Sequence, residues 1–476
     1  MPDNKRKENI ENYFNKMAEF RNFWKNKNLF FHEEDEKYLS FLIPKGSNII
    51  VLGCGTGHLI PGLEPEKAIG IDMSQNMINI ASKNNNQYEF IVGDIEDKVI
   101  IESLDQKFDY ILLPDTIGFL DDCQSTINLL HRLCDKNTRV VISYYSYLWE
   151  PILKIAEILK LKMPQIEMNY LTTDDIVNLL NLAEFEVIKQ EWRQILPIRL
   201  FGIGPVINKY IATLPFIRKL CLRNYVIARS LDKIDKSLDS CSIIIPCKNE
   251  KGNIEEAVKR IPDFCENIEI VFVEGHSTDG TFEEIENIQS KYNDKNIIAI
   301  KQSGVGKADA VYKAFDIAKN QVLMILDADL TVPPEQLDKF WHTISSGKGE
   351  YINGSRLVYP MEKDAMRFLN FIANRLFSII FSWLLNQRYT DTLCGTKVIT
   401  KSNYIKIKNN RDYFGDFDPF GDFDLIFGSS KLNLKMVEIP IQYQARSYGE
   451  TQISRFKHGI LLLRMAFHGY KKLKAF

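Results

Sequence analysis

The sequence NIIVLGCGTG, residues 48–57, joins a short β-branched run directly to a turn that contains three glycines. The run predicts a buried strand at 48–52. Gly53, Gly55 and Gly57 allow the backbone to tighten and to approach a ligand closely, and we expect a helix to begin directly after them. Unpaired amides at that helix N-terminus favour a carboxylate or phosphate, so the stretch predicts an α/β domain with a ligand site at the glycine turn.

Acidic residues end the two strands predicted next along the chain. Asp72 follows the strand at 68–71, at the sequence distance where a carboxylate can take both ribose hydroxyls of an adenosine cofactor. Asp94 ends the sequence FIVGD at 90–94 and closes a third strand at the same sheet edge. A lone Gly-x-Gly-x-Gly is compatible with a simple tight turn, but the following acid and the strand context favour a nucleoside site.

The alternation of β-branched runs with amphipathic segments starts over near residue 240. The first series predicts strands at 48–52, 68–71, 108–113 and 139–143 with a helix at 121–134, and the second predicts strands at 242–245, 268–273 and 322–326. Strands that alternate with helices predict parallel sheets covered on both faces. The polar, charge-alternating stretch 229–240 indicates a helix end or a linker. We therefore expect two tandem doubly wound α/β domains, at 1–230 and 241–476, joined by a linker at 231–240.

Composition narrows the class of protein. The chain has 476 residues, 45% hydrophobic and 26% charged, which is typical of a packed enzyme-sized protein. Sixty basic and 62 acidic residues leave a formal charge of -2, which gives no basis for bulk binding to nucleic acid. Eight cysteines without a Cys-x-x-Cys pair predict neither a zinc site nor a disulfide framework. The polar N-terminus and the lack of an apolar run of about 18 residues predict a cytoplasmic protein without a secretory signal or membrane span.

The spacing inside the glycine turn distinguishes two cofactors. A dinucleotide-binding turn has its third glycine three residues after the second, whereas Gly57 follows Gly55 by two. The turn resembles motif I of class I S-adenosylmethionine-dependent methyltransferases, and the resemblance covers about residues 10–230, including LTTDD at 171–175 before FEVI at 185–188. It implies a Rossmann-like fold with S-adenosylmethionine as cofactor. The implied cofactor-binding residues are Gly53, Gly55, Gly57, Asp72 at the ribose and Asp94 at the adenine.

One departure from that family concerns the methionine end of the cofactor. The family has an acid two residues before the first motif glycine, and this chain has Val51, so a usual polar partner is absent. We expect Asp109, Asp115 and Thr116 to face the sulfonium side, either as a weak base or acceptor partner or as a solvated turn. The apolar stretch 195–216, broken by prolines and glycines, is either a lid over a hydrophobic acceptor or a seam between the domains.

The second series of strands brings further polar residues to one sheet edge. The strand at 242–245 leads into Pro246 and Glu250, and the strand at 268–273 ends at Glu274. The sequence GVGK at 304–307 opens a helix and combines glycine-freed amides with a lysine cation, which predicts an anion site.

A pair of carboxylates follows the last of these strands. Asp327 and Asp329 come directly after the strand at 322–326, on the same side of an extended chain. Hard oxygen ligands at a strand end suit Mg²⁺ or Mn²⁺ that bridges a diphosphate. Asp-x-Asp also occurs in solvated turns. However, this motif and the three before it, which contain Glu250, Glu274 and Lys307, form a specific pattern because they occur in this order within about 85 residues.

The four motifs resemble family 2 glycosyltransferases of the GT-A fold, closest to the polyprenyl-phosphate glycosyltransferase branch, over about residues 240–458. The resemblance implies an inverting enzyme with a nucleotide-sugar donor. Glu274-Gly275 stands where the family has paired aspartates, which leaves the nucleobase open. The implied donor ligands are Pro246 at the nucleotide, Glu250 and Glu274 at the base and ribose, Lys307 and Arg446 at the diphosphate, Asp327 at the ribose or metal, and Asp329 at the metal.

The same resemblance implies residues for the acceptor. Arg356 and Arg367 would bind an acceptor phosphate, with arginines paired with solvent as the alternative. The candidate catalytic residues are Asp391, Asp422 and Asp424. The last two begin a helix where the family carries its base, so helix capping competes with general-base duty. A hydroxyl acceptor needs a base to take its proton, whereas a phosphate acceptor is already ionised.

Two segments of the second domain indicate contact with a membrane surface. Residues 368–385 are almost wholly apolar but too short to span a bilayer. An apolar stripe from Ile453 to Tyr470 is accompanied by basic residues, and no acid follows Glu450. Such a basic amphipathic helix can lie in an anionic membrane interface, and the alternative is packing on the domain or on a partner.

These features predict a fused enzyme of glycan or glycolipid assembly. We expect the N-terminal domain to transfer a methyl group from S-adenosylmethionine and the C-terminal domain to transfer a sugar to a glycan or polyprenyl-phosphate acceptor, with no nucleic acid partner. The alternative is a polyprenyl-phosphate glycosyltransferase whose N-terminal domain binds a nucleoside without catalysis and serves regulation. We expect a cytoplasmic location, with peripheral attachment to the cytosolic face of an anionic membrane.

Overall fold

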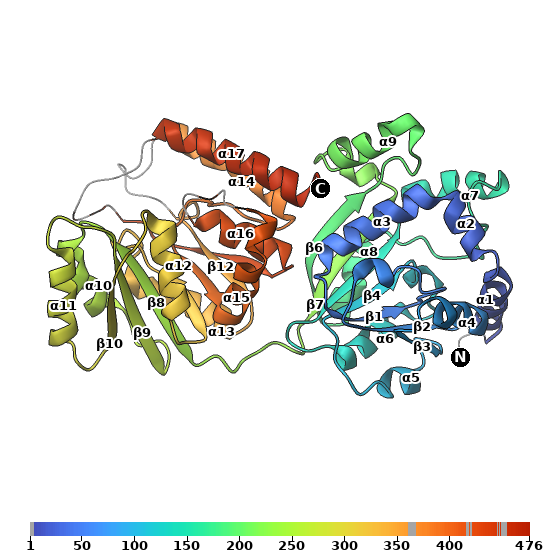
Figure 1. Cartoon of the computed structure of the whole chain (residues 1–476), viewed down its shortest axis with the longest axis horizontal. Coiled ribbons are helices and arrows are strands. Elements are labelled where there is room, and N and C mark those ends of the chain that lie inside the picture. The colour runs from blue at the N-terminus through green and yellow to red at the C-terminus, as the bar shows by residue number, and fades with distance from the viewer. Residues whose placement is uncertain are drawn as a thin grey trace. The chain divides into compact units, whose positions relative to one another are not determined.

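The computed structural model describes residues 4–359, 368–415, 418, 421–444, 446, 448 and 455–476, with the backbone alone at 4, 368–373 and 455–458. The chain forms two compact units that divide between Ile234 and Asp235 (Figure 1). Each unit contains one seven-stranded sheet with helices packed against it. The predicted order of two tandem α/β domains is therefore confirmed.

The first unit is built on a mixed sheet with the strand order β3-β2-β1-β4-β5-β7-β6. Strands β1 to β5 run parallel, and β7 runs antiparallel to both β5 and β6. The strands are β1 (Asn48–Leu52), β2 (Lys67–Asp72), β3 (Glu89–Val92), β4 (Tyr110–Pro114), β5 (Arg139–Tyr145), β6 (Phe185–Arg193) and β7 (Arg223–Ser230).

The first sheet departs from the predicted parallel pattern at β7, a strand that the sequence did not predict. All eight residues of this strand are buried, although they include Arg223, Asn224 and Arg229. Its polar side chains make the strand hard to recognise in the sequence. The two arginines are buried because carboxylates lie beside them: Arg229 pairs with Glu186 at 2.7 Å and Arg223 with Asp35 at 3.0 Å. Arg229 and Ser230 also belong to β7, so the helix end or linker expected from residue 229 begins only at residue 231.

Helices lie on both faces of the first sheet (Figure 1). They are α1 (Asn4–Met17), α2 (Arg21–Lys27), α3 (Leu29–Leu42), α4 (Gln75–Asn84), α5 (Lys98–Glu102), α6 (Cys123–Leu129), α7 (Glu150–Ile158), α8 (Thr173–Leu182) and α9 (Ile203–Val206). The LTTDD sequence opens α8, because Thr172 and Asp175 cap each other's backbone amides.

The second unit has the strand order β10-β9-β8-β11-β13-β12-β14. Strands β8 to β11 run parallel, while β13 runs antiparallel to β11 and β12 and so departs from the predicted parallel pattern. The strands are β8 (Ser240–Cys247), β9 (Asn267–Glu274), β10 (Asn296–Lys301), β11 (Val322–Ile325), β12 (Tyr351–Ser355), β13 (Lys397–Thr400) and β14 (Met436–Pro440).

The helices of the second unit are α10 (Ile254–Arg260), α11 (Thr281–Lys291), α12 (Lys307–Ile317), α13 (Leu337–Ser345), α14 (Phe368–Leu385), α15 (Lys401–Asn409), α16 (Asp422–Lys431) and α17 (Arg455–Leu473). The register pairs Cys247 with Glu274 and Glu274 with Lys301, so the carboxyl ends of β8, β9 and β10 meet at one sheet edge. Among the described residues, every helix is too short or too polar to cross a lipid bilayer.

Candidate active sites

The glycine turn after β1 adopts a backbone that only glycine takes up readily. Gly53, Gly55 and Gly57 have φ of 79°, 54° and 68°. A Cβ on Gly53 would lie 2.2 Å from the Thr116 hydroxyl, so the turn also needs glycine for space. The expected helix does not follow: the chain continues through turns to a single 3₁₀ turn at Pro61–Leu63. Three left-handed residues in five are incompatible with a right-handed helix, so the predicted helix N-terminus is wrong here.

Asp72 at the end of β2 bridges to this turn. Its carboxylate accepts the Gly55 amide hydrogen at 2.8 Å and the Ser74 amide hydrogen at 2.9 Å. Burial raises the pKa of the Asp72 carboxyl above its usual value, and the two backbone donors oppose that shift. Asp94 lies beyond β3, where it accepts from the Lys7 ammonium and from the Glu96 amide at 3.0 Å.

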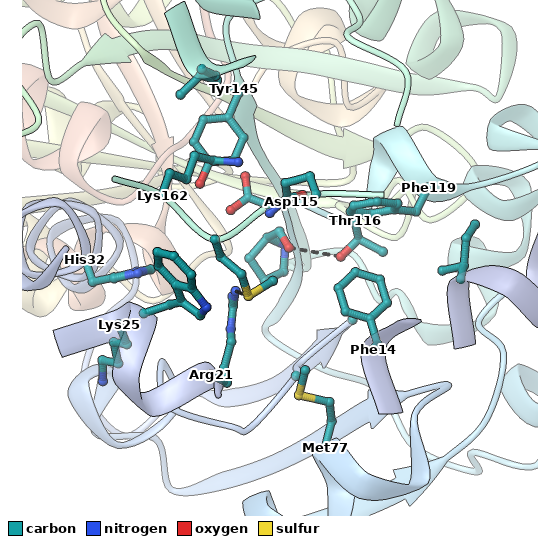
Figure 2. A pocket seen from close by; sticks show the side chains of 18 of the residues that line it. Phe14, Arg21, Lys25, His32, Met77, Asp115, Thr116, Phe119, Tyr145 and Lys162 are labelled. Atoms are coloured by element: carbon teal, nitrogen blue, oxygen red, sulfur yellow. Dashed lines mark hydrogen bonds between the residues drawn. The ribbon is translucent and has the colours of Figure 1, made fainter. Parts of the chain in front are cut away.

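A pocket of about 310 Å³ lies next to the glycine turn (Figure 2). Gly53, Gly55, Asp72 and Asp94 line it, as the sequence predicts, but Gly57 does not. The structure therefore brings four of the five predicted cofactor-binding residues to one cavity.

The N-terminal helices form one wall of this pocket, which the sequence did not predict. Lys7 and Phe14 of α1 and Arg21 and Lys25 of α2 line it. Asn15 anchors α1 by accepting from the Ser74 hydroxyl at 2.7 Å, at the N-terminus of α4. The regular spacing of Lys7, Ile10 and Phe14 on one helix face is the signal that could have indicated this wall.

A buried ion-pair network supports the opposite wall. Arg223 of β7 donates to both oxygens of Asp35, at 3.0 and 3.1 Å, and also to Asp115. The Arg223 guanidinium lies 5.0 Å from the centre of the Tyr145 ring. Asp115 and Tyr145 line the pocket, so the network holds two of its polar groups in place (Figure 2).

Of the residues expected at the sulfonium side, Asp115 and Thr116 line the pocket and Asp109 does not. Asp109 precedes β4 at the opposite end of the strand, where its carboxylate accepts the Asn48 amide at 2.8 Å. The expectation that Asp109 faces the sulfonium side is therefore wrong, because Asp109 precedes the first residue of β4, Tyr110, whereas the pocket lies at the other end of the strand.

We predict that Asp72→Ala weakens S-adenosylmethionine binding by about 1–3 kcal/mol, because a charged hydrogen-bond partner is lost from a pocket wall. Titration calorimetry on the full chain measures the change. Asp105→Ala, which removes an exposed loop carboxylate from the same unit, is the control. Equal affinity of Asp72→Ala and the wild type would contradict a cofactor site at this carboxylate.

In the second unit, three chain segments meet around Arg446. Its guanidinium donates to Asp329, after β11, at 2.7 Å and to Glu250, after β8, at 3.3 Å. Glu250 also accepts from Asn253 at 2.7 Å, and burial raises the pKa of the Glu250 carboxyl. Three of the predicted donor ligands thus form one ion-pair cluster.

The other predicted donor ligands lie around the same sheet edge. Lys307 begins α12 and pairs with Asp327 at 2.6 Å. Burial opposes the charge of Lys307, but Asp327 and Asp422 raise its pKa above the usual value. Glu274 is buried and accepts the Ser277 amide hydrogen, and Pro246 lies in β8 opposite Val273.

The carboxylate pair fits a divalent cation in part. Asp327 and Asp329 supply hard oxygen donors, but each is already neutralised by a cation. No group of three or more His, Cys, Asp or Glu side chains within the described part of the chain is placed to hold a metal. Because Mg²⁺ is usually bound by one or two carboxylates together with substrate phosphates and water, this donor set suits an ion that arrives with the donor.

Each described candidate base is paired with a cation. Asp391 is buried and accepts from two guanidinium nitrogens of Arg356, both at 2.7 Å. Lys397 lies 3.1 Å from Asp422, and Arg411 donates to Asp424 at 2.7 Å. Burial alone would raise the pKa of Asp391, but Arg356 lowers it below the usual value. The predicted acceptor ligand Arg367 lies outside the described residues.

The comparisons with known proteins agree with both units. Residues 43–197 match the family model described as a methyltransferase domain, and residues 242–406 match the model described as glycosyl transferase family 2. The chain therefore joins a methyltransferase domain to a family 2 glycosyltransferase domain, and both resemblances seen in the sequence are confirmed.

Individual relatives resemble parts of the chain. A dolichol-phosphate mannosyltransferase of Pyrococcus furiosus is 40% identical over 25% of this chain and 33% of its own length. An undecaprenyl-phosphate 4-deoxy-4-formamido-L-arabinose transferase of Edwardsiella ictaluri is 22% identical over 47% of this chain and 65% of its own length. The chain thus spans less than two thirds of either relative. A crystal structure of a methyltransferase from Thermotoga maritima covers 46% of this chain and 99% of its own, at 19% identity and a TM-score of 0.37.

Proposed function

We propose that the chain is a bifunctional enzyme that transfers a sugar from a nucleotide-sugar donor and a methyl group from S-adenosylmethionine. The meeting of Glu250, Asp329 and Arg446 at the strand ends supports the sugar-transfer site. The pocket beside the glycine turn, with Asp72 in its wall, supports the methyl-transfer site.

We infer that the sugar acceptor is a polyprenyl phosphate rather than a glycan hydroxyl. A hydroxyl acceptor needs a free base, and Asp391, Asp422 and Asp424 are each engaged by a cation. A phosphate is already ionised and needs cations instead. The relatives, named for dolichol phosphate and undecaprenyl phosphate, support the same acceptor class.

In the sugar-transfer site, cations compensate the negative charge of the nucleotide-sugar diphosphate. Asp327 and Asp329 would hold Mg²⁺ or Mn²⁺, which would stabilise negative charge on the departing diphosphate. Lys307 and Arg446 add two cations at the same edge, and each is held in place by a carboxylate. Glu274 is held by the Ser277 amide, so its position at the nucleoside is fixed before the donor binds.

In the methyl-transfer site, the chain orients the cofactor and excludes water. Asp72 orients the cofactor ribose, and apolar side chains such as Phe14 and Leu153 exclude water. Burial raises the pKa of the pocket-lining Asp115 carboxyl, although its partner Arg223 opposes the shift, and we infer that this paired carboxylate orients the sulfonium end of the cofactor.

Two assays on one purified chain test the proposal. Release of S-adenosylhomocysteine measures methyl transfer, and transfer of label from nucleotide sugars to polyprenyl phosphate measures sugar transfer. Sugar transfer without S-adenosylhomocysteine release would favour a non-catalytic N-terminal domain. That alternative is supported by Val51, which is buried in β1 and offers no polar group to the methionine end.

We also propose peripheral attachment through α14 and α17 to the cytosolic face of an anionic membrane. Ile460, Leu463 and Phe467 of α17 are each more than half exposed, as is Ile379 of α14. The helices pack together, with the rings of Trp383 and Tyr470 5.6 Å apart. Ile453 and Phe456 of the predicted stripe lie outside the side chains that the structure describes.

We predict that Phe467→Asp lowers binding to anionic vesicles severalfold, because it places a charge in the apolar face that inserts into the interface. Co-sedimentation with phosphatidylglycerol vesicles at low and high salt measures the change. Ile405→Asp, at an exposed apolar position of α15, is the control. If Phe467→Asp and the wild type bind equally, α17 does not contact the membrane.

A further inference from the structure

The mouth of the methyltransferase pocket is apolar and open to solvent. Ile152, Leu161 and Ile198 line the pocket, yet each is more than half exposed. They belong to two segments, 147–161 and 195–220, which we call the rim surface. Apolar residues at a pocket entrance are costly to leave in water, so they indicate that something apolar covers them.

The rim surface extends well beyond the pocket. Phe201 is 101% exposed and Phe216 is 95% exposed, and Ile155 and Ile158 of α7 are also largely exposed. Phe201 has a left-handed backbone with φ of 54°, next to Leu200 with φ of 39°. Two consecutive non-glycine residues in this conformation are strained, and such strain persists where it serves binding.

Charge on this surface has one sign along its longer segment. Residues 195–220 contain Arg199, Lys209, Arg218 and Lys219 and no acid. Arg199 pairs with Glu33 at 2.6 Å. Apolar side chains interleaved with cations match the interface of a membrane that carries anionic lipids, rather than a neutral protein surface.

The pocket behind the rim carries cations of its own. Arg21 and Lys25 are one turn apart on α2 and both line the pocket. Within the described part of the chain, neither has a carboxylate within 4 Å, and the Arg21 guanidinium donates to the Met163 sulfur at 3.7 Å. Asp72, Asp94, Glu96 and Asp115 also line the pocket, so it is the part next to Arg21 and Lys25 that favours an anionic group, as the rim favours an apolar one.

We propose that the rim surface docks on an anionic membrane leaflet, and that the methyl acceptor is an ionised oxygen of an anionic lipid that enters the pocket from the bilayer. The bond between the methyl carbon and the sulfur of S-adenosylmethionine would break as the bond to the lipid oxygen forms, and S-adenosylhomocysteine would leave. The proposed docking depends only on the rim surface, whereas the proposed lipid acceptor rests on the proposed methyltransferase activity. The lipid chain would cross the rim beside Ile152, Leu161 and Ile198, and its charged group would meet Arg21 and Lys25.

The test compares full-length variants in a Phe467→Asp background, which lowers the contribution of α17. Phe201→Asp/Phe216→Asp changes the rim surface without touching the pocket lining. Val99→Asp/Leu182→Asp adds the same charge at exposed apolar positions outside the rim surface and is the matched control. Co-sedimentation with phosphatidylglycerol and phosphatidylcholine vesicles measures docking, and calorimetry with S-adenosylmethionine checks that the pocket is intact.

We expect the rim variant to lose at least about tenfold in binding to phosphatidylglycerol vesicles, with the control unchanged and the binding weakened by salt. Equal binding of rim variant and control would overturn the proposal. Dimerisation of the wild type through this surface would also overturn the proposal. Analytical ultracentrifugation would then show a dimeric control and a monomeric rim variant.

Labelled S-adenosylmethionine with vesicles of total polar lipid tests the acceptor part. We expect label in the organic phase, reduced at least about tenfold by the rim substitutions although the variant still binds the cofactor. Label confined to water-soluble products would overturn the lipid acceptor. Absence of any methyl transfer would instead contradict the proposed function, while the vesicle-binding result would still decide the docking surface.

Discussion

Asp329→Asn is expected to lower sugar transfer by at least about a hundredfold, which corresponds to about 2.7 kcal/mol of transition-state stabilisation. The substitution keeps the shape of the side chain and one acceptor oxygen for Thr331, which now donates at 2.8 Å. It removes the charge that pairs with Arg446 at 2.7 Å and that would contribute to holding the metal. Without that charge, the negative charge growing on the departing diphosphate is poorly stabilised.

The same variant should bind S-adenosylmethionine like the wild type, because Asp72 and the glycine turn belong to the other compact unit. Asp263→Asn, which neutralises an exposed loop carboxylate of the second unit, controls for the change in net charge. Sugar transfer is measured with labelled donor at several Mn²⁺ concentrations. A near wild-type rate with unchanged metal dependence would exclude Asp329 from the site.

Arg223→Met is expected to destabilise the first unit by about 3–5 kcal/mol. The Arg223 side chain is fully buried, and its guanidinium neutralises Asp35 and Asp115. Methionine fills much of the space, but it leaves the buried Asp35 and the partly exposed Asp115 without a cation. Urea unfolding of the full chain measures the loss, and a shift on adding S-adenosylmethionine identifies the transition of the first unit.

The pH dependence of the destabilisation by Arg223→Met distinguishes a loss of charge pairing from a loss of packing. Burial raises the pKa of Asp115 above its usual value even beside Arg223, and without the guanidinium the rise is larger. A carboxyl whose pKa is higher folded than unfolded stabilises the folded state as the pH falls. The destabilisation by Arg223→Met should therefore shrink toward acid pH, and Asp35→Asn in the same chain should restore part of the stability. A loss that is independent of pH would indicate packing alone.

The strands and the acids that follow them could be predicted from the sequence. β1 was predicted with its exact bounds, and Asp72, Glu274 and Asp327 were placed at the sheet edges where they lie. This worked because parallel strands deliver the residues after them to one edge, so sequence order alone implies proximity. The helix expected after the glycine turn does not form, because the positive φ angles of three glycines are incompatible with a right-handed helix.

Local sequence order determined which residues reach each sheet edge, since strand periodicity is a property of neighbouring residues. The partners of those residues were decided by the tertiary structure alone. Arg446 reaches Glu250 across 196 residues of sequence, and Arg223 reaches Asp35 across 188. No periodicity links positions so far apart, and only packing of the sheets and helices brings the charges together. The choice between a hydroxyl acceptor and a phosphate acceptor also depends on tertiary contacts. In the sequence, Asp391, Asp422 and Asp424 are equivalent candidate bases. Their pairing with Arg356, Lys397 and Arg411 in the structure favours an acceptor that is already ionised.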